Sequence, residues 1–268
     1  MINNKRNFKI IPEQNPRIIL PNALTLIGVC IGLSSIKFAL DQNYGLAIIA
    51  VTIAAIFDTL DGRIARLIKG TSKVGKELDS LTDVVSFGVA PAFIMYFWSL
   101  NQLGKFGWLI VLIYVVCCAL RLARFNIMTK DEKSLWKSNF FEGVPSPAGA
   151  GLVLLPLIFH ETGIYKFDQH VLLITSTMFI LTSFLMISKV PTYSLKKITI
   201  KRSTTIFLLF SICLYFGLLI IYTFKLLFLT GIIYLTFIPV SYFHYRKLSK
   251  REKISEHSQE VEEVEDVL

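Results

Sequence analysis

Residues 58–83 read DTLDGRIARLIKGTSKVGKELDSLTD, and this stretch places four aspartates in or beside segments that otherwise predict membrane-spanning helices. A carboxylate at the centre of a bilayer costs roughly 2.5–3.5 kcal/mol, so four of them indicate a function that needs negative charge. The stretch follows the pattern Asp58-x2-Asp61-Gly62-x2-Ala65-Arg66-x8-Gly75-x3-Asp79-x3-Asp83.

The spacing of these aspartates predicts that their side chains converge. Asp58 and Asp61 lie three residues apart on one helix, and Gly75, Asp79 and Asp83 follow steps of four on the next, so each set shares a helix face. If the two helices pair, bare carboxylates repel one another. Hard divalent cations such as Mg²⁺, Mn²⁺ or Ca²⁺ cancel that repulsion and prefer oxygen ligands. We therefore expect a divalent-metal site for a pyrophosphate-containing substrate.

The residues between the aspartates suit a nucleotide or phosphate ligand. Gly62 and Gly75 leave room for a ligand to approach the backbone, and Arg66 could hold a phosphate oxygen. The structural alternative is that the aspartates pair with neighbouring basic side chains. Pairing alone does not require the observed spacing, so we favour the metal site. The candidate basic partners are Arg63, Arg66, Lys69, Lys73 and Lys76.

Composition predicts an all-α, polytopic integral membrane protein rather than a soluble domain. The chain has 268 residues, 53% of them hydrophobic, and a mean hydropathy of +0.58. We expect about eight transmembrane helices, because most of the apolar stretches are near the roughly 20 residues needed to cross a bilayer. The eight stretches are 18–39, 44–66, 80–99, 106–125, 147–163, 169–189, 204–224 and 227–245.

Three regions follow from this pattern. Residues 1–17 form a polar cytoplasmic segment, 18–245 a transmembrane catalytic domain, and 246–268 a basic and then acidic tail that is expected to be disordered. The N-terminal segment does not have the pattern of a cleavable signal peptide. The four cysteines fall in apolar stretches and are expected to be free thiols.

The net charge of +9 is distributed as membrane topology requires. If both termini are cytoplasmic, only four basic residues lie on the outer side, and the rest lie in inner segments, as the positive-inside rule predicts. The charge therefore favours lipid over nucleic acid as a partner, and it places the aspartate cluster at the cytoplasmic face. The outer residues are Lys37, Lys105, Lys166 and Lys225.

The aspartate pattern matches the signature of the CDP-alcohol phosphatidyltransferase family, which the chain resembles from residue 21 to about residue 147. The resemblance implies that family's membrane fold, a homodimer, and a location in a bacterial-type inner (cytoplasmic) membrane. It also implies a reaction in which a CDP-linked lipid loses CMP as a hydroxyl attacks the lipid-side phosphate. Asp58, Asp61 and Asp79 are then ligands of Mn²⁺ or Mg²⁺. Asp83 is the general base and a further candidate ligand.

The same resemblance assigns the nucleotide-binding residues. Gly62, Ala65, Arg66 and Gly75 would line the CDP pocket. Three hydroxyl residues are candidate contacts to cytidine, ribose or phosphate, although capping or loop hydrogen bonds explain them equally well. These three are Thr59, Thr71 and Ser72.

Three further segments, 121–126, 141–148 and 188–193, resemble the phosphatidylserine synthase branch of the family. Glu142 departs from that branch, where a small polar residue such as Asn is expected. The resemblance implies CDP-diacylglycerol and L-serine as substrates, with the acyl chains entering an apolar groove between helices.

A serine acceptor is a zwitterion, so its site needs a cation for the carboxylate and an oxygen for the ammonium. Arg121 and Arg124 lie three apart on one helix face, and one could grip the carboxylate with two parallel hydrogen bonds. Asn126, Ser146 or Glu142 could receive the ammonium.

Several alternatives stay open at this level. Both arginines could extend to lipid headgroups instead. The acceptor could be glycerol 3-phosphate or inositol phosphate, and membrane carboxylates also occur in cation transporters. Asn22 and Thr25, at the start of the first apolar stretch, could form hydrogen bonds within the site or cap a helix.

Overall fold

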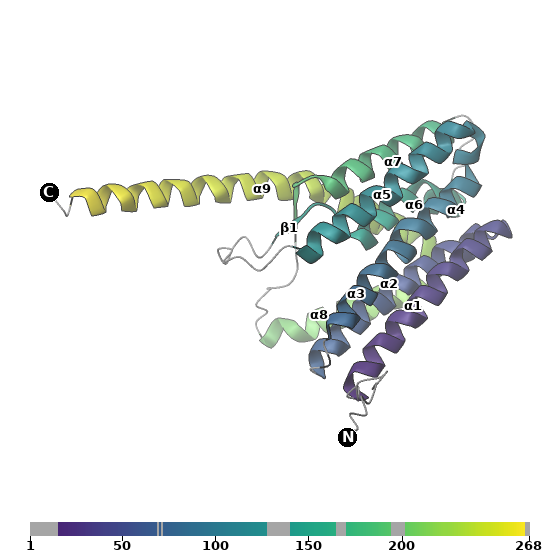
Figure 1. The fold of residues 1–268 in the computed structure, drawn as a ribbon, viewed down its shortest axis with the longest axis horizontal. Helices are drawn as coiled ribbons and strands as arrows, with labels where there is room; N and C mark the ends of the chain where they lie inside the picture. Colours follow the sequence, from purple (N-terminus) through teal and green to yellow (C-terminus); the bar gives the residue numbers. More distant parts are fainter. Residues whose placement is uncertain are drawn as a thin grey trace, which may run out of the picture.

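The computed structural model describes residues 16–68, 70, 72–127, 140–164, 170–193 and 202–265. Helices dominate these ranges and pack side by side into a bundle (Figure 1). In chain order the elements are α1 (Pro16–Leu40), α2 (Tyr44–Leu67), α3 (Lys73–Asp83), the π-helix η1 (Val84–Val89), α4 (Ala90–Trp98), the short 3₁₀ helix η2 (Leu100–Leu103), α5 (Lys105–Ile127), β1 (Phe140–Glu142), α6 (Ser146–Glu161), α7 (Val171–Ile187), β2 (Pro191–Tyr193), α8 (Arg202–Ile221) and α9 (Thr223–Glu265).

In the described part of the chain, helices cover most of each of the eight predicted apolar stretches, which confirms an all-α polytopic membrane protein. Within the described ranges, five helical segments are long and apolar enough to cross a membrane. They are Ile19–Leu40, Tyr44–Leu67, Val74–Trp98, Lys105–Ile127 and Thr223–Leu248. The other three stretches form shorter helices: α7 and α8 contain apolar segments of fewer than 18 residues, and α6 has 16 residues.

The helix that carries Asp79 and Asp83 starts earlier than its apolar stretch. Ser72 caps α3 by accepting a hydrogen bond from the Gly75 N–H at 2.9 Å. The chain then continues without a break through α3, η1 and α4. Asp79 and Asp83 therefore lie within a membrane-length helical segment.

The π-helix η1 follows Asp83 directly and is tightly enclosed. Proline has no N–H, so Pro91 cannot donate to the carbonyl of Phe87 four residues earlier, as an α-helix would require. The buried hydroxyl of Tyr114 on α5 donates to that carbonyl at 2.8 Å. On the α1 side, a Cβ on Gly32 would lie 2.5 Å from Ser86 Oγ. These contacts fix α1 and α5 against the helix that carries the two aspartates.

Two segments far apart in the sequence meet in the antiparallel pair β1–β2, where Phe141 lies opposite Thr192. The next residue after β1 is Gly143, with φ +76°, and a Cβ there would lie 2.8 Å from the Met186 carbonyl oxygen. The Thr192 hydroxyl donates to the Gly143 carbonyl at 2.9 Å. Segments 141–148 and 188–193 therefore lie together beside the end of α7.

The last helix, α9, has 43 residues and continues to Glu265, beyond the predicted end of the transmembrane domain at residue 245. Disorder of the tail in solution stays a prediction. Figure 1 shows its C-terminal part extending away from the bundle. Residues 246–265 contain neither glycine nor proline, so no strong helix breaker ends α9 at the predicted boundary.

Candidate active site

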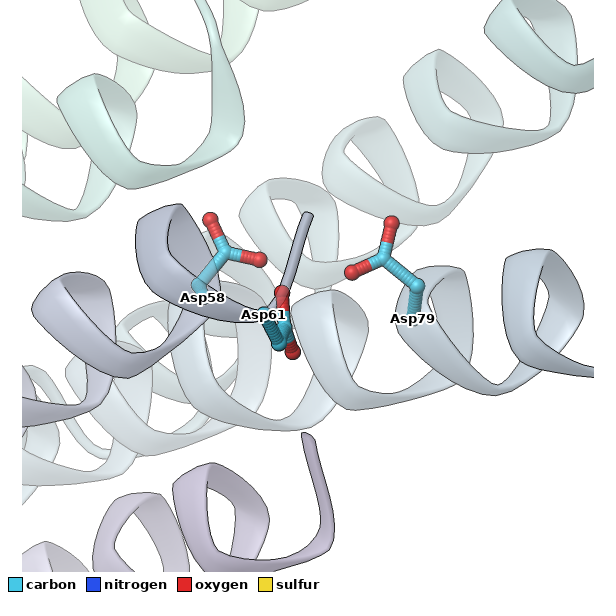
Figure 2. A group of neighbouring side chains, drawn as sticks. All are labelled: Asp58, Asp61 and Asp79. Carbon is cyan, nitrogen blue, oxygen red and sulfur yellow. The ribbon is translucent and has the colours of Figure 1, made fainter. Parts of the chain in front are cut away.

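The carboxylates of the aspartate pattern meet between α2 and α3. One oxygen from each of Asp58, Asp61 and Asp79 lies within 4.8 Å of the others. Figure 2 shows Asp58 and Asp79 extending toward each other from neighbouring helices, with Asp61 between them. Asp83 lies one turn along α3 from Asp79 and beside Asp58. Two paired helices therefore concentrate negative charge in a small volume, as the spacing predicted.

No described basic side chain forms a direct ion pair with these carboxylates. Within the described ranges, the four carboxylates have no Lys or Arg nitrogen within 4.0 Å. The Arg66 Nε instead donates to the Gly62 carbonyl at 3.0 Å, and the Lys76 Nζ to the Asn126 carbonyl at 3.4 Å. Lys69 and the side chain of Lys73 lie outside the described part of the chain. The pairing alternative is thus unsupported wherever it can be examined.

The carboxylates also have free coordination capacity. Asp61 Oδ1 and Asp83 Oδ1 are buried, and neither has a hydrogen-bond partner in the described residues. A buried polar atom left without a partner is costly, so such atoms usually bind something. Carboxylate oxygens from two helices are the ligand type that Mg²⁺ and Mn²⁺ prefer. The donor set therefore fits a hard divalent cation.

The cluster lies in a cavity of about 440 Å³, a volume within the usual range for small-molecule sites. Its wall includes eleven of the residues predicted for the site, from α2, α3 and its N-cap, α5 and α6, and adds Asn22 and Thr25 from α1. The lining residues are Pro21, Asn22, Thr25, Asp58, Asp61, Gly62, Ala65, Arg66, Gly70, Ser72, Gly75, Lys76, Asp79, Asp83, Arg121, Leu122, Phe125, Pro145, Ser146 and Pro147.

Gly62 and Gly75, two of the glycines that line the cavity, differ in what surrounds them. A Cβ on Gly75 would lie 2.9 Å from Asn22 Oδ1 and 3.0 Å from Ser72 Oγ, so this glycine allows α3 to approach α1. A Cβ on Gly62 would meet no atom within 4 Å. Protein packing does not require a glycine at Gly62, and the open space there is available to a ligand.

Arg121 and Arg124 have different surroundings. The Arg121 Nη1 donates to the buried Ser146 Oγ at 2.9 Å, and its Nε is buried without a partner in the described residues. The Arg124 Nη1 donates to the carbonyl of Ile187 at 2.9 Å, and Arg124 is absent from the cavity wall. Arg121 faces the aspartate cavity, whereas Arg124 ties the end of α5 to the end of α7.

Three other predicted site residues are not brought to the cavity, or cannot be placed. The exposed Thr59 donates its hydroxyl hydrogen to the Ala55 carbonyl at 2.9 Å. The Asn126 amide donates to Ser80 Oγ at 2.8 Å, which links α5 to α3. Neither residue lines the cavity, and Thr71 lies outside the described residues.

The structure resolves the question left open for Asn22 and Thr25. α1 begins at Pro16, so both residues lie inside the helix and do not cap it. Both line the cavity, and the Thr25 hydroxyl is 2.6 Å from Asp61 Oδ2. The three-residue spacing that places them on one helix face was the available signal. Lys76 and Phe125 also line the cavity, but no pattern in the sequence singled them out as site residues.

Comparison with known proteins agrees with this geometry. The chain is 36% identical over 241 residues to a CDP-diacylglycerol–serine O-phosphatidyltransferase of Mycobacterium leprae, a match that covers 86% of this chain and 77% of the relative. A protein of the same name from Helicobacter pylori strain J99 is 43% identical over 141 residues, covering 53% and 58% of the two chains. The Saccharomyces cerevisiae protein of that name is 41% identical over 131 residues, covering 44% and 47%.

A family model described as CDP-alcohol phosphatidyltransferase matches residues 18–187. This range includes α1 from residue 18, all of α2 and α3, the four aspartates and every residue that lines the cavity. The match covers more than half of the chain, and the carboxylates that carry the family's signature lie together in one cavity. The chain therefore belongs to the CDP-alcohol phosphatidyltransferase family.

Proposed function

We propose that this protein transfers the phosphatidyl group from CDP-diacylglycerol to the hydroxyl of L-serine, giving phosphatidylserine and CMP in phospholipid biosynthesis. One observation carries the proposal: a half-buried carboxylate cluster shares a cavity with Arg121 and Ser146, a cation and a hydroxyl that suit a serine acceptor. The names of the relatives from three distant organisms support the same donor and acceptor.

Asp58, Asp61 and Asp79 would hold the divalent cation, Mn²⁺ or Mg²⁺, and Asp83 adjoins them. When bound, the cation would neutralise negative charge on the pyrophosphate and on the departing CMP. The free buried oxygens of Asp61 and Asp83 support this assignment.

The donor nucleotide would occupy the part of the cavity formed by α2 and the start of α3. Gly62 offers open space, Ala65 adds only a methyl group, and Ser72 and Gly75 line the same cavity. Arg66 lines the same region and can turn its guanidinium to a phosphate oxygen.

The acceptor would bind beside Arg121. Its guanidinium would hold the serine carboxylate, and Ser146 Oγ fixes one side of that guanidinium at 2.9 Å. Asp83 lines the same cavity and is close enough to Arg121 to interact with its charge. A serine held at Arg121 would therefore direct its hydroxyl toward Asp83.

Bond making and breaking then balance as follows. The serine oxygen forms a bond to the lipid-side phosphorus, and the bond from that phosphorus to the CMP oxygen breaks, with the electron pair leaving on CMP. Asp83 accepts the hydroxyl proton as general base.

The surrounding helices suit a lipid donor. A second, mostly apolar cavity of about 240 Å³ lies among η1, α2, α6 and α9. Pro147 lines both this cavity and the aspartate cavity, so the two adjoin. Acyl chains would enter there from the inner leaflet. We further propose a homodimer in a bacterial-type inner membrane, with the active site and both termini cytoplasmic, on the basis of the family and the charge distribution.

The cation-transporter alternative gains no support from the site. Carboxylates of a transporter would come from distant spans and meet at the middle of the membrane, often at broken helices. Here they come from the consecutive helices α2 and α3.

An acceptor panel tests the proposal. Purified protein with CDP-diacylglycerol and Mn²⁺ should form an aminophospholipid from L-serine, detected by mass spectrometry, and no product from glycerol 3-phosphate or inositol phosphate. A product from another alcohol only would keep the donor site and overturn the assignment of Arg121 to serine.

A further inference from the structure

Thr25 makes a contact that the proposed reaction does not use. It lies on α1, its side chain is 6% exposed, and its Oγ1 is 2.6 Å from Asp61 Oδ2. The same hydroxyl is 3.0 Å from the Pro21 carbonyl oxygen, one turn earlier on α1. A hydroxyl has one hydrogen to donate, and the shorter contact to a charged oxygen is the stronger bond. We therefore assign the hydrogen to Asp61.

The two oxygens of Asp61 are thereby distinguished. Oδ2 is held by Thr25, whereas Oδ1 is buried without a partner in the described residues. Asp61 is itself 3% exposed and lies between Asp58 and Asp79 (Figure 2). Holding a carboxylate by one oxygen restricts rotation of its plane, and the other oxygen keeps a fixed direction.

We propose that Thr25 is a positioning residue, which holds Asp61 through Oδ2 so that the carboxylate is oriented for a divalent cation before the cation arrives. The inference rests on the proposed metal site and adds a residue from a third helix to it. Hydrogen-bond partners of metal ligands commonly contribute 10–100-fold to metal affinity, because they fix the orientation of the ligand.

Neighbouring contacts explain why α1 can serve this role. Asn22, three residues before Thr25, lies against Gly75 of α3, where a Cβ would be 2.9 Å from Asn22 Oδ1. One face of α1 thus contacts α2 through Thr25 and α3 through Asn22. α1 carries no carboxylate of the cluster, but it contacts both helices that do, α2 and α3.

The test uses the full-length protein in detergent, without lipid substrate, and measures Mn²⁺ binding from the electron paramagnetic resonance signal of free Mn²⁺. Thr25→Val keeps the shape of the side chain and removes the hydroxyl, and Thr25→Ser keeps the hydroxyl. Ser35→Ala is the matched control, because Ser35 is a buried α1 hydroxyl that donates to the Gly32 carbonyl of its own helix, at 2.6 Å, rather than to an aspartate.

We expect Thr25→Val to weaken Mn²⁺ binding by about 10-fold or more. Thr25→Ser and Ser35→Ala should bind within about threefold of the native protein, because both keep the contact to Asp61. The concentration of Mn²⁺ that half-activates CMP release should shift by the same factor as the binding.

Native affinity in Thr25→Val would overturn the positioning role and leave the metal site intact. An equal loss in Ser35→Ala would also overturn it, since the effect would then come from any buried hydroxyl of α1. If Thr25→Val does not fold, Thr25→Ala removes the same hydroxyl, and native Mn²⁺ affinity in it would overturn the role. Native protein that binds no Mn²⁺ would instead contradict the proposed metal-dependent function itself.

Discussion

Arg121 and Arg124 offer a matched pair of substitutions for the acceptor site. They lie three residues apart on α5, yet only Arg121 lines the aspartate cavity. Lysine at either position keeps the positive charge but loses the planar guanidinium that can form two parallel hydrogen bonds. We predict that Arg121→Lys impairs the use of serine and that Arg124→Lys has little effect.

The expected size follows from the bonds that change. Arg121 already uses Nη1 on Ser146, and its buried Nε lacks a partner in the described residues, so it is free for the acceptor. Lysine would lose one of the two hydrogen bonds to the serine carboxylate. A hydrogen bond to a charged group contributes about 1.5–3 kcal/mol. Since about 1.4 kcal/mol corresponds to a factor of ten, kcat/KM for serine should fall by roughly 10–150-fold.

Arg124→Lys should change the same constant by less than about threefold, because an ammonium can still donate to the Ile187 carbonyl and no substrate contact is lost. The assay measures the initial rate of CMP release. Serine is varied at saturating CDP-diacylglycerol, and CDP-diacylglycerol is then varied at saturating serine. A rise in the KM for CDP-diacylglycerol, with the serine constants unchanged, would refute the reasoning and assign Arg121 to the donor phosphates. Equal losses in the two variants would refute it as well.

Three further substitutions test the donor side of the cavity. Asp83→Asn should abolish turnover, because an amide cannot accept the hydroxyl proton, while binding of CDP-lipid stays near native; lost binding with residual turnover would contradict the base assignment. Asp79→Ala should weaken Mn²⁺ and nucleotide binding together, measured by titration, and an unchanged metal dependence would count against its role as a ligand. Gly62→Ala should leave the thermal unfolding temperature unchanged or slightly raised, because a Cβ there meets no atom within 4 Å, yet it should raise the KM for CDP-diacylglycerol; an unchanged KM would show that the ligand does not use this space.

Helical periodicity allowed the aspartate cluster at the centre of the site to be predicted from the sequence. Spacings of three and four placed Asp58 with Asp61 and Asp79 with Asp83, and the short interval between them required neighbouring helices. The structure brings oxygens of Asp58, Asp61 and Asp79 within 4.8 Å of one another. The eight apolar stretches likewise predicted the helices, since composition and length determine which segments can cross a bilayer.

Contacts between segments that lie far apart in the sequence could not be predicted from residue spacing. Arg121 and Arg124 are both arginines on one face of α5. Their partners distinguish them, because Ser146 packs against Arg121 and the Ile187 carbonyl packs against Arg124. The link from Asn126 to Ser80 spans 46 residues of sequence. Such partners depend on how helices pack, which no local pattern specifies.

Local sequence patterns also do not specify a structure where the same residues are compatible with two conformations. The charged segment after residue 245 suits either a solvated helix or a disordered tail, and the structure has it in α9 to Glu265. Pro91 follows the π-helix η1, and the hydroxyl of Tyr114, on a different helix, donates to the Phe87 carbonyl within it. Its place directly after Asp83 was therefore not predictable from residues 84–89 alone.

The most direct test of the central claim is CMP release by the purified protein with CDP-diacylglycerol and Mn²⁺, measured with and without L-serine. We predict CMP release that depends on serine, matches the phosphatidylserine formed mole for mole, and stops when the metal is chelated. Folded protein that releases no CMP with serine, or that releases it equally with and without serine, would contradict the proposed function.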